Sequence, residues 1–533
     1  MDLRRVLRSS SVALVGAALL MSGCSSGDGG SAGAESKPAE QPPNSTRTPG
    51  GDAEPLRPLQ KKIPADLAPY YEQKLEWRDC DAAGFRCARL TVPLDYEDPS
   101  EDAELRLAVS RRKASGDGPA IGSLMVNPGG PGGSAIDYLR QAAAVGFPAE
   151  LRDRYDLVGM DPRGVGRSEP VECLSGREMD RYTRTDQTPD DADEVDALAT
   201  AYENFAKGCR QRSGGLLEHV STRDAARDMD VLRAVLGDRK LYYYGASYGT
   251  YLGATYAGLF PYRTGRLVLD GAIDPSLDAL EINRQQTGGF ATAFRAFAED
   301  CVERDDCPLG TGSVQQAGKR LGDLFEKIDR KPLRTGSSRT LTESLAATGV
   351  IQAMYTEVYW PRLRLALTEA AGGNGAGLLA LSDAYYERGS DGSYGNIMFA
   401  NAAVNCADLP PAFSSPGDVE DSVGSFEKVS PVFGRTFAWA SLNCAYWQVE
   451  PTGSPHRIAA AGAAPMLVVG TTRDPATPYS WAQGLAGQLR TGRLLTYEGD
   501  GHTAFMQGSQ CIDAAITDYF VDGDVPPEGT RCE

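Results

Sequence analysis

Leu241-Tyr242-Tyr243-Tyr244-Gly245-Ala246-Ser247-Tyr248-Gly249 is the stretch of sequence that decides the fold. Its apolar and aromatic start is typical of a buried strand, and residues 250–259 after it are compatible with a helix. A strand that turns sharply into a helix through G-x-S-x-G holds the serine in a strained backbone conformation. We therefore expect the Ser247 hydroxyl to project from the end of a sheet. The pattern alone also fits a plain strand–turn–helix connection, so the interpretation depends on the residues that accompany it.

The length and charge of the chain limit its architecture and its partners. With 533 residues it is too long for one minimal domain, which predicts a large domain with an insertion, or two domains. The formal net charge of −18 argues against a nucleic-acid partner, because phosphate binding needs a basic face. An acidic surface keeps an exported protein soluble. We expect a monomer that needs no cofactor.

The N-terminal residues predict export and lipid anchoring. Residues 1–23 combine a basic start, including Arg4 and Arg5, with an apolar core at 12–21 that has the length of a signal peptide. The core is followed by Ser-Gly-Cys24, which resembles a bacterial lipobox, so Cys24 is expected to be the lipidated first residue of the mature protein. An ordinary secretory signal with an incidental cysteine is the alternative, and the paired arginines leave twin-arginine export open.

Residues 24–60 are rich in Gly, Ser and Pro and have no apolar period, which predicts a flexible linker. The folded part is therefore expected outside the cytoplasm, tethered to the cell membrane through the lipid alone or released to the medium.

The cysteine count supports an exported protein. Of the 11 cysteines, lipidation of Cys24 leaves ten for disulfides, which persist outside the cytoplasm. No pair has zinc-finger spacing with matching histidines, so no metal site is expected. Connectivity does not follow from sequence; sequential pairing is the simplest solution because it closes short loops, and it predicts Cys80–Cys87, Cys173–Cys209, Cys301–Cys307, Cys406–Cys444 and Cys511–Cys532.

Short apolar strands alternate with helices over most of the chain. The expected strands are residues 89–94, 105–109, 123–127, 157–161, 241–244, 267–270, 466–470 and 494–497. This alternation implies a parallel sheet covered by helices on both faces. Helical segments dominate between 275 and 455, which predicts a cap inserted between two parts of one core, 61–274 and 456–533. The acidic run 186–196 lacks the Gly and Glu of a calcium loop and is interpreted as a solvated surface insert.

A serine hydroxyl needs an adjacent base to act as a nucleophile, and the chain has three histidines. In this kind of site the order along the chain is Ser, acid, His. His219 precedes Ser247, and His456 lies in a linker-like stretch, so the first is interpreted as structural and the second as a surface residue. His502 follows a late strand, on a loop with a glycine directly before it. We therefore predict His502 as the base.

The acid that orients the histidine is expected on the loop after the preceding strand. Asp474 occupies that position, in Gly470-Thr471-Thr472-Arg473-Asp474-Pro475. Asp270 and Asp274, which follow an earlier strand, are rivals. A third rival, Asp500, is only two residues from the histidine, which is a poor geometry for the bond between the side chains.

The glycine-rich loop 127–134 follows an early strand. Glycines let backbone N–H groups point at a developing oxyanion without obstruction by side chains. We predict that the hole is formed by the N–H of Tyr248 and that of Gly130. The alternative, a phosphate-binding loop, lacks the G-K-[ST] ending and the dinucleotide fingerprint.

Four motifs together resemble the prolyl iminopeptidase and tripeptidyl aminopeptidase family of α/β-hydrolases: Pro128-Gly129-Gly130-Pro131-Gly132, Asp161-Pro162-Arg163-Gly164-Val165-Gly166-Arg167-Ser168, Gly245-Ala246-Ser247-Tyr248-Gly249 and Gly470-Thr471-Thr472-Arg473-Asp474-Pro475. The likeness covers roughly residues 75–533 and is greatest to secreted bacterial tripeptidyl aminopeptidases. Where the family's glycine loop often begins with His, this chain has Pro128, which fits the tripeptidyl group better. The resemblance implies the α/β-hydrolase fold: a mostly parallel central sheet flanked by helices, with an inserted helical cap.

The resemblance also implies release of residues or short peptides from a free N-terminus, with acids of the cap holding the substrate's ammonium group. Removing an ammonium from water without a carboxylate partner is expensive. Glu357, in an aromatic-rich helix, and Asp408, just after a cysteine, are the candidates for this role.

The sequence therefore predicts an exported, lipid-anchored serine peptidase that acts on peptide or protein N-termini through an acyl-enzyme on Ser247. An esterase or lactonase with the same triad is an alternative, because ester and amide hydrolysis share the acyl-enzyme. A non-catalytic lipoprotein that binds peptides is a further alternative, and the complete triad argues against it.

Overall fold

The computed structural model describes residues 53–80 and 82–533. The predicted signal peptide, Cys24 and most of the predicted linker lie outside these residues. Within them, no helix is long and apolar enough to cross a bilayer.

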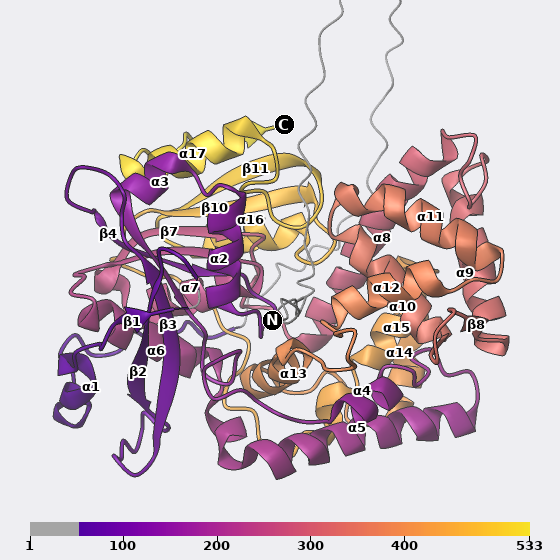
Figure 1. The fold of residues 1–533 in the computed structure, drawn as a ribbon, viewed down its shortest axis with the longest axis horizontal. Helices are drawn as coiled ribbons and strands as arrows, with labels where there is room; N and C mark the ends of the chain where they lie inside the picture. Colours follow the sequence, from indigo (N-terminus) through magenta and orange to yellow (C-terminus); the bar gives the residue numbers. More distant parts are fainter. Residues whose placement is uncertain (1–52, 81) are drawn as a thin grey trace, which may run out of the picture.

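A ten-stranded sheet forms the centre of the molecule (Figure 1). Its order is β1-β2-β3-β5-β4-β6-β7-β10-β11-β12. The pairs β1–β2, β2–β3 and β3–β5 are antiparallel, and every later pair is parallel. The strands are β1 (Arg78–Asp79), β2 (Arg86–Pro93), β3 (Glu104–Arg112), β4 (Gly122–Asn127), β5 (Tyr155–Met160), β6 (Leu241–Ala246), β7 (Thr264–Asp270), β10 (Met466–Arg473), β11 (Gly492–Asp500) and β12 (Arg531–Cys532). The predicted α/β class and mostly parallel sheet are confirmed.

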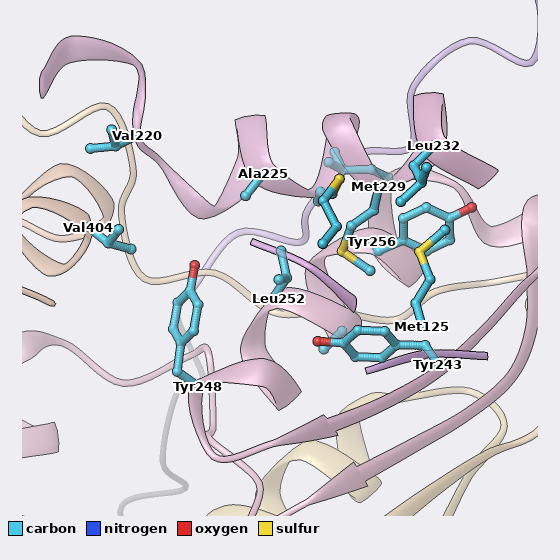
Figure 2. Packing of buried hydrophobic residues seen from close by; sticks show 14 of the residues in the cluster. Met125, Val220, Ala225, Met229, Leu232, Tyr243, Tyr248, Leu252, Tyr256 and Val404 are labelled. Atoms are coloured by element: carbon cyan, nitrogen blue, oxygen red, sulfur yellow. The ribbon is translucent and has the colours of Figure 1, made fainter. Parts of the chain in front are cut away.

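Helices cover both faces of the sheet because successive strand residues point to opposite sides. Met125 and Tyr243 pack with the helices on one face, as Figure 2 shows, and their neighbours Leu124 and Tyr244 pack with those on the other. The first face carries α6 (Thr222–Val235), α7 (Tyr248–Leu259) and α16 (Tyr479–Gln488). The second carries α2 (Ala135–Val145), α3 (Ala149–Arg154) and α17 (Gln510–Val521).

A mainly helical region lies between β7 and β10 in the sequence and beside the sheet in space (Figure 1). Many of its buried side chains form a second core, separate from those of the sheet. Its helices are α8 (Ala279–Val302), α9 (Val314–Arg330), α10 (Glu343–Met354), α11 (Trp360–Ala371), α12 (Ala376–Tyr385), α13 (Ile397–Asp408), α14 (Pro416–Val429) and α15 (Gly434–Ala440), with the short hairpin β8 (Leu333–Arg334) and β9 (Thr340–Leu341).

Two helices from the range assigned to the core pack with this region as well as with the main core. They are α4 (Gly176–Tyr182) and α5 (Ala192–Ser213), which lie beneath it in Figure 1. Leu198 and Tyr202 of α5 share a hydrophobic cluster with Phe426 and Trp439. The interpretation of the acidic run 186–196 as a solvated insert was accordingly wrong in part. Thr188, within it, donates a hydrogen bond to Glu343 of α10.

The five predicted disulfides are present, paired in sequential order. One of them, Cys406–Cys444, joins the end of α13 to the short helix η5 (Asn443–Tyr446). It therefore fixes the helix that carries Asp408.

Candidate active site

Ser247 stands on the sharp turn between β6 and α7, as the sequence indicates. Its φ of 56° lies in the left-handed region, which a residue with a side chain adopts only under constraint. The constraint comes in part from its backbone N–H, which donates to the carbonyl of Asp270 on the neighbouring strand at 2.8 Å. The turn thus places the serine at the carboxyl end of the parallel strands, where sites in open α/β sheets lie.

Asp474 and His502 are hydrogen-bonded to each other. The Nδ1 atom of His502 lies 2.9 and 3.0 Å from the two carboxylate oxygens of Asp474. Asp474 is buried and also accepts hydrogen bonds from the N–H groups of Ala476 and Thr477 and from the Thr477 hydroxyl. Burial alone would lower the pKa of His502, but the charge of Asp474 and its hydrogen bond raise that pKa above the ordinary value of 6.5. The imidazole is therefore held in one orientation by a carboxylate that stabilises its protonated form.

The rival acids have other partners. Asp270 accepts hydrogen bonds from the N–H groups of Ala504 and Phe505 and so supports the loop that carries His502. Asp500 forms an ion pair with Arg473. Among the residues that the structure describes, Asp474 is the carboxylate hydrogen-bonded to His502.

The other two histidines lie elsewhere, although His456 is not a surface residue. His219 is half-buried, and its carbonyl accepts from the guanidinium of Arg163. His456 is also half-buried, with its ring 5.9 Å from that of Tyr251, and burial lowers its pKa. Its neighbour Tyr251 explains the difference from the sequence interpretation, because it covers the imidazole.

Ser247 and His502 both lie beside the end of β7, at Asp270 and Gly271. A Cβ atom at Gly271 would lie 3.3 Å from the His502 ring, and the preceding residue, Asp270, accepts the hydrogen bond of the Ser247 N–H. Within the described residues no hydrogen bond joins the Ser247 hydroxyl to the imidazole. Such bonds are often long before a substrate is in place.

The glycine loop lies directly against the serine. A Cβ atom at Gly129 would be 2.8 Å from the Cβ of Ser247, so only glycine permits this approach. The N–H of Gly129 donates to Asn127, but among the described residues the N–H of Gly130 has no acceptor. Tyr248 begins α7, where an N–H group has no partner within the helix. Gly130, Ser247 and Tyr248 line one cavity, which is compatible with the predicted oxyanion hole of Gly130 and Tyr248.

This cavity of about 350 Å³ lies between the sheet and the cap. Its wall includes Asp274 and Asp408, whereas no lysine or arginine occurs among its described lining residues. Asp274 accepts hydrogen bonds from Ser276 and Gln488. The cavity is therefore acidic and has no fixed cation to neutralise it.

Of these two carboxylates, Asp408 accepts fewer hydrogen bonds. It is 6% exposed, and its two oxygens accept only from the N–H and the hydroxyl of Thr222, at 2.8 and 2.5 Å. Burial raises its pKa to about 7, although the hydrogen bonds from Thr222 act in the opposite direction. No cationic side chain pairs with it among the described residues. A carboxylate in this state has an unmet preference for a cation.

The structure gives no support to the prediction that Glu357 binds the substrate's amino group. Glu357 is exposed, on the short helix η4 (Glu357–Tyr359), and is absent from the lining of the cavity. Burial, and then the neighbouring carboxylate of Asp500, raise its pKa. The aromatic context that suggested Glu357 belongs instead to Tyr355, whose ring lies 5.5 Å from that of His502 and whose carbonyl accepts the His502 N–H at 2.9 Å.

Sequence reasoning missed the polar face of α13. Asn401, Asn405 and Asp408 all line the cavity. Their spacing of four and three residues places them on one side of a helix, and this pattern is visible in the sequence. The pattern does not by itself indicate a site, because a polar helix face usually meets solvent.

Comparison with known proteins gives relatives that match most of the chain. The sequence model of the family described as "TAP-like protein" matches residues 430–532. "Serine protease Hip1" of Mycobacterium tuberculosis is 39% identical over 487 residues, which cover 87% of this chain and 92% of that protein. "Carboxylesterase B" of the same organism is 37% identical over 482 residues, or 87% and 91% of the two chains. "Tripeptidyl aminopeptidase" of Streptomyces coelicolor is 31% identical over 470 residues, 86% of each chain.

Proposed function

The chain belongs to the TAP-like family of α/β-hydrolase serine peptidases and is a serine hydrolase; from this premise we propose that it is an aminopeptidase-type enzyme, exported and lipid-anchored, that releases short peptides or residues from free N-termini. Ser247, His502 and Asp474 form its catalytic triad. Gly130 and Tyr248 supply the oxyanion hole, and Asp408 binds the substrate's amino end.

The reaction passes through an acyl-enzyme. The Ser247 oxygen attacks the scissile carbonyl while His502 takes the hydroxyl proton, and Asp474 stabilises the resulting imidazolium through Nδ1. The N–H groups of Gly130 and Tyr248 stabilise the negative charge on the carbonyl oxygen. His502 then gives its proton to the leaving amine. A water, deprotonated by the same imidazole, hydrolyses the ester, and the serine recovers its proton.

The acidic cavity is the observation that carries the choice of a free-amine substrate. The buried carboxylate of Asp408 lacks a cationic partner and lies in the wall of the cavity that contains Ser247. A substrate ammonium would pair with this carboxylate. An N-blocked peptide would place an uncharged amide beside it and leave the carboxylate's charge unneutralised. An esterase with the same triad is the second candidate, favoured by the relative named "Carboxylesterase B".

Export and anchoring are supported by independent features. The sequence of residues 1–24 has the order of a lipoprotein signal, ending in Cys24. The five disulfides suit an oxidising compartment. Cys24→Ala is expected to move the protein from the membrane fraction to the soluble fraction in its native host. Unchanged fractionation would argue for an ordinary secretory signal or another anchor.

The proposal is tested by hydrolysis of paired reporter peptides that are identical except for a free or an acetylated N-terminus. We expect cleavage of the free-amine member and at least a tenfold lower kcat/KM for the acetylated one. Ser247→Ala should abolish cleavage and covalent labelling by a fluorophosphonate. Equal rates on both peptides would contradict amino-end recognition. Full activity of the serine variant would contradict the assignment of the nucleophile, and an unlabelled wild-type protein would favour a non-catalytic peptide-binding role.

A further inference from the structure

We propose that Asn401 and Asn405 of α13 hold the backbone of the peptide segment that is released, and so determine how many residues it contains. The inference rests on the proposed function, because it takes the scissile carbonyl to lie at Ser247 and the amino end at Asp408. It assigns a positioning role to a helix face that contains neither the nucleophile nor its partners.

Helix α13 is fixed to the sheet domain rather than free to move with the cap. At its start, the side chain of Asn396 accepts from the N–H of Gly166 at 2.8 Å and donates to the carbonyl of Gly164 at 2.9 Å. At its end, Asp408 is bonded to Thr222, the first residue of α6. In Figure 2 Val404, midway along α13, lies close to Val220, and both belong to the main core of the sheet. A helix held at both ends and along its apolar side is a rigid support for a binding site.

The polar side of α13 begins at the oxyanion loop. The amide nitrogen of Asn401 donates to the carbonyl of Pro131, next to Gly130, at 3.4 Å. The helix approaches this loop so closely that a Cβ atom at Gly132 would lie 3.1 Å from the Cβ of Ala400. One end of the polar face therefore adjoins the oxyanion hole, and the other end is the carboxylate of Asp408.

Asn401 and Asn405 have hydrogen-bonding groups without a partner among the described residues. The amide nitrogen of Asn405 donates to the Asn401 oxygen at 3.0 Å. A primary amide has two donors and an acceptor oxygen. Among the described residues, the Asn405 oxygen and the second N–H of each amide have no partner. Both residues line the cavity, Asn401 half-buried and Asn405 exposed. In the proposed complex these groups bind the peptide backbone, which offers matching N–H and C=O groups.

The length of this polar face limits the peptide segment that it can hold. Asp408 lies seven residues beyond Asn401. At about 1.5 Å per residue, this part of the helix spans about 10 Å. An extended peptide rises about 3.3 Å per residue, so about three residues fit between the oxyanion loop and the carboxylate. A shorter amino end cannot reach Asp408 while its carbonyl lies at the oxyanion loop.

The experiment compares Asn401→Leu and Asn405→Leu with the wild type on reporters that have one, two, three or four residues before the leaving group. Asn204→Leu is the matched control, since Asn204 is an exposed asparagine on α5 that does not line the cavity. Each loss of one or two neutral hydrogen bonds is expected to reduce kcat/KM on the three-residue reporter by about 5- to 20-fold. For Asn405→Leu, the one-residue reporter should change by less than about twofold, because a single residue at the oxyanion loop does not extend to Asn405. The rate of labelling by a small fluorophosphonate, measured on the same samples, should stay unchanged.

The outcomes separate this inference from the function on which it rests. A length profile unchanged in both variants would overturn the role of the amides while leaving the aminopeptidase intact. An equal loss on every reporter, together with slower labelling, would also overturn it, because Asn401 would then act only by holding Pro131. A wild-type enzyme that is labelled but cleaves none of the free-amine reporters would overturn the proposed function itself, and the inference with it.

Discussion

Asp408→Asn should make the protein less active and more stable at the same time. The carboxylate is buried, and both of its partners come from Thr222, an N–H and a hydroxyl. Asparagine has the same shape and keeps these contacts: its oxygen accepts from the N–H, and its amide group donates to the hydroxyl oxygen. The substitution therefore removes a charge without leaving a cavity or an unpaired group.

The gain in stability depends on pH in a defined direction. Burial raises the pKa of Asp408 from 3.8 to about 7, so the folded protein favours the neutral carboxyl. Stability that is fully present below pH 3.8 is lost as the pH rises through about 7, and the loss amounts to about 4 kcal/mol at 1.36 kcal/mol per pKa unit. Asparagine stays neutral at every pH and avoids this loss. Its stabilising effect should be greatest above pH 7 and vanish near pH 4.

The loss of activity follows from the same charge. A hydrogen-bonded contact between the substrate ammonium and a buried carboxylate contributes about 2 to 3 kcal/mol, so kcat/KM for a free-amine reporter should fall by about 30- to 150-fold. In the wild type, protonation of both Asp408 and His502 lowers kcat/KM as the pH falls, because the pKa of each is raised. Asp408→Asn retains only the contribution of His502. The acid side of its pH profile should accordingly be less steep.

The assays are kcat/KM between pH 5 and 9 and thermal unfolding at pH 4.5 and 8. Asp421→Asn is the control, since Asp421 is an exposed carboxylate on α14. A lower unfolding temperature at pH 8 would refute the argument about the buried charge. Wild-type kcat/KM with an unchanged acid limb would refute the role of Asp408 in binding the amino end. Thermal unfolding therefore tests the buried charge of Asp408, and kcat/KM independently tests its role in binding the amino end.

Two further predictions concern other contacts of the site. Asp474→Asn should reduce kcat by about 10³- to 10⁴-fold and move the pKa of His502 downward, because burial would then act on the imidazole without an opposing charge; single-turnover hydrolysis against pH measures both, and an unmoved acid limb would contradict the assignment. Replacing Cys406 and Cys444 together by serine opens a link between residues 38 positions apart and should cost about 4 kcal/mol of stability. Because this bond holds the end of α13, KM should also rise in the cysteine variant, and an unchanged KM would show that α13 is fixed without it.

The sheet and the turn at Ser247 could be predicted because their signals are local. Apolar runs such as 241–246 and 466–470 identify buried strands, and G-x-S-x-G specifies the turn through small residues at fixed positions. The Asp474–His502 pair could be located by its order after these strands. Each of these inferences needs only a few adjacent residues and the rule that parallel strands end at one edge.

The placement of α5 and α13 could not be obtained in the same way. Leu198 of α5 finds its apolar partners more than 200 residues away, in Phe413 and Phe426, and nothing in its own sequence names them. Similarly, α13 lies within the helical insertion, but its apolar side packs on the core of the sheet. A hydrophobic stripe predicts that a helix face is buried, without predicting what covers it.

The same limit explains why Asp408 and Glu357 were indistinguishable in the sequence. Both are acids of the cap next to apolar residues, and only the tertiary structure buries one and exposes the other. The difference appears in the contacts: Asp408 accepts from the N–H and the hydroxyl of Thr222, whereas Glu357 is exposed and lies near Asp500 and Arg473. The proposed role of Asp408 rests on the absence of a paired cation among the described residues.

The acidic cavity also bears on why relatives of one family carry the names of a protease and an esterase. The triad forms the same acyl-enzyme from an amide or an ester. The chemistry of the scissile bond therefore discriminates poorly between peptide and ester substrates. An uncompensated carboxylate at the far end of the cavity discriminates more strongly, since its cost to the folded protein is offset only when a cation arrives. Under the proposed function, substrate choice is made at the amino end, through Asp408, and not by the bond that is broken.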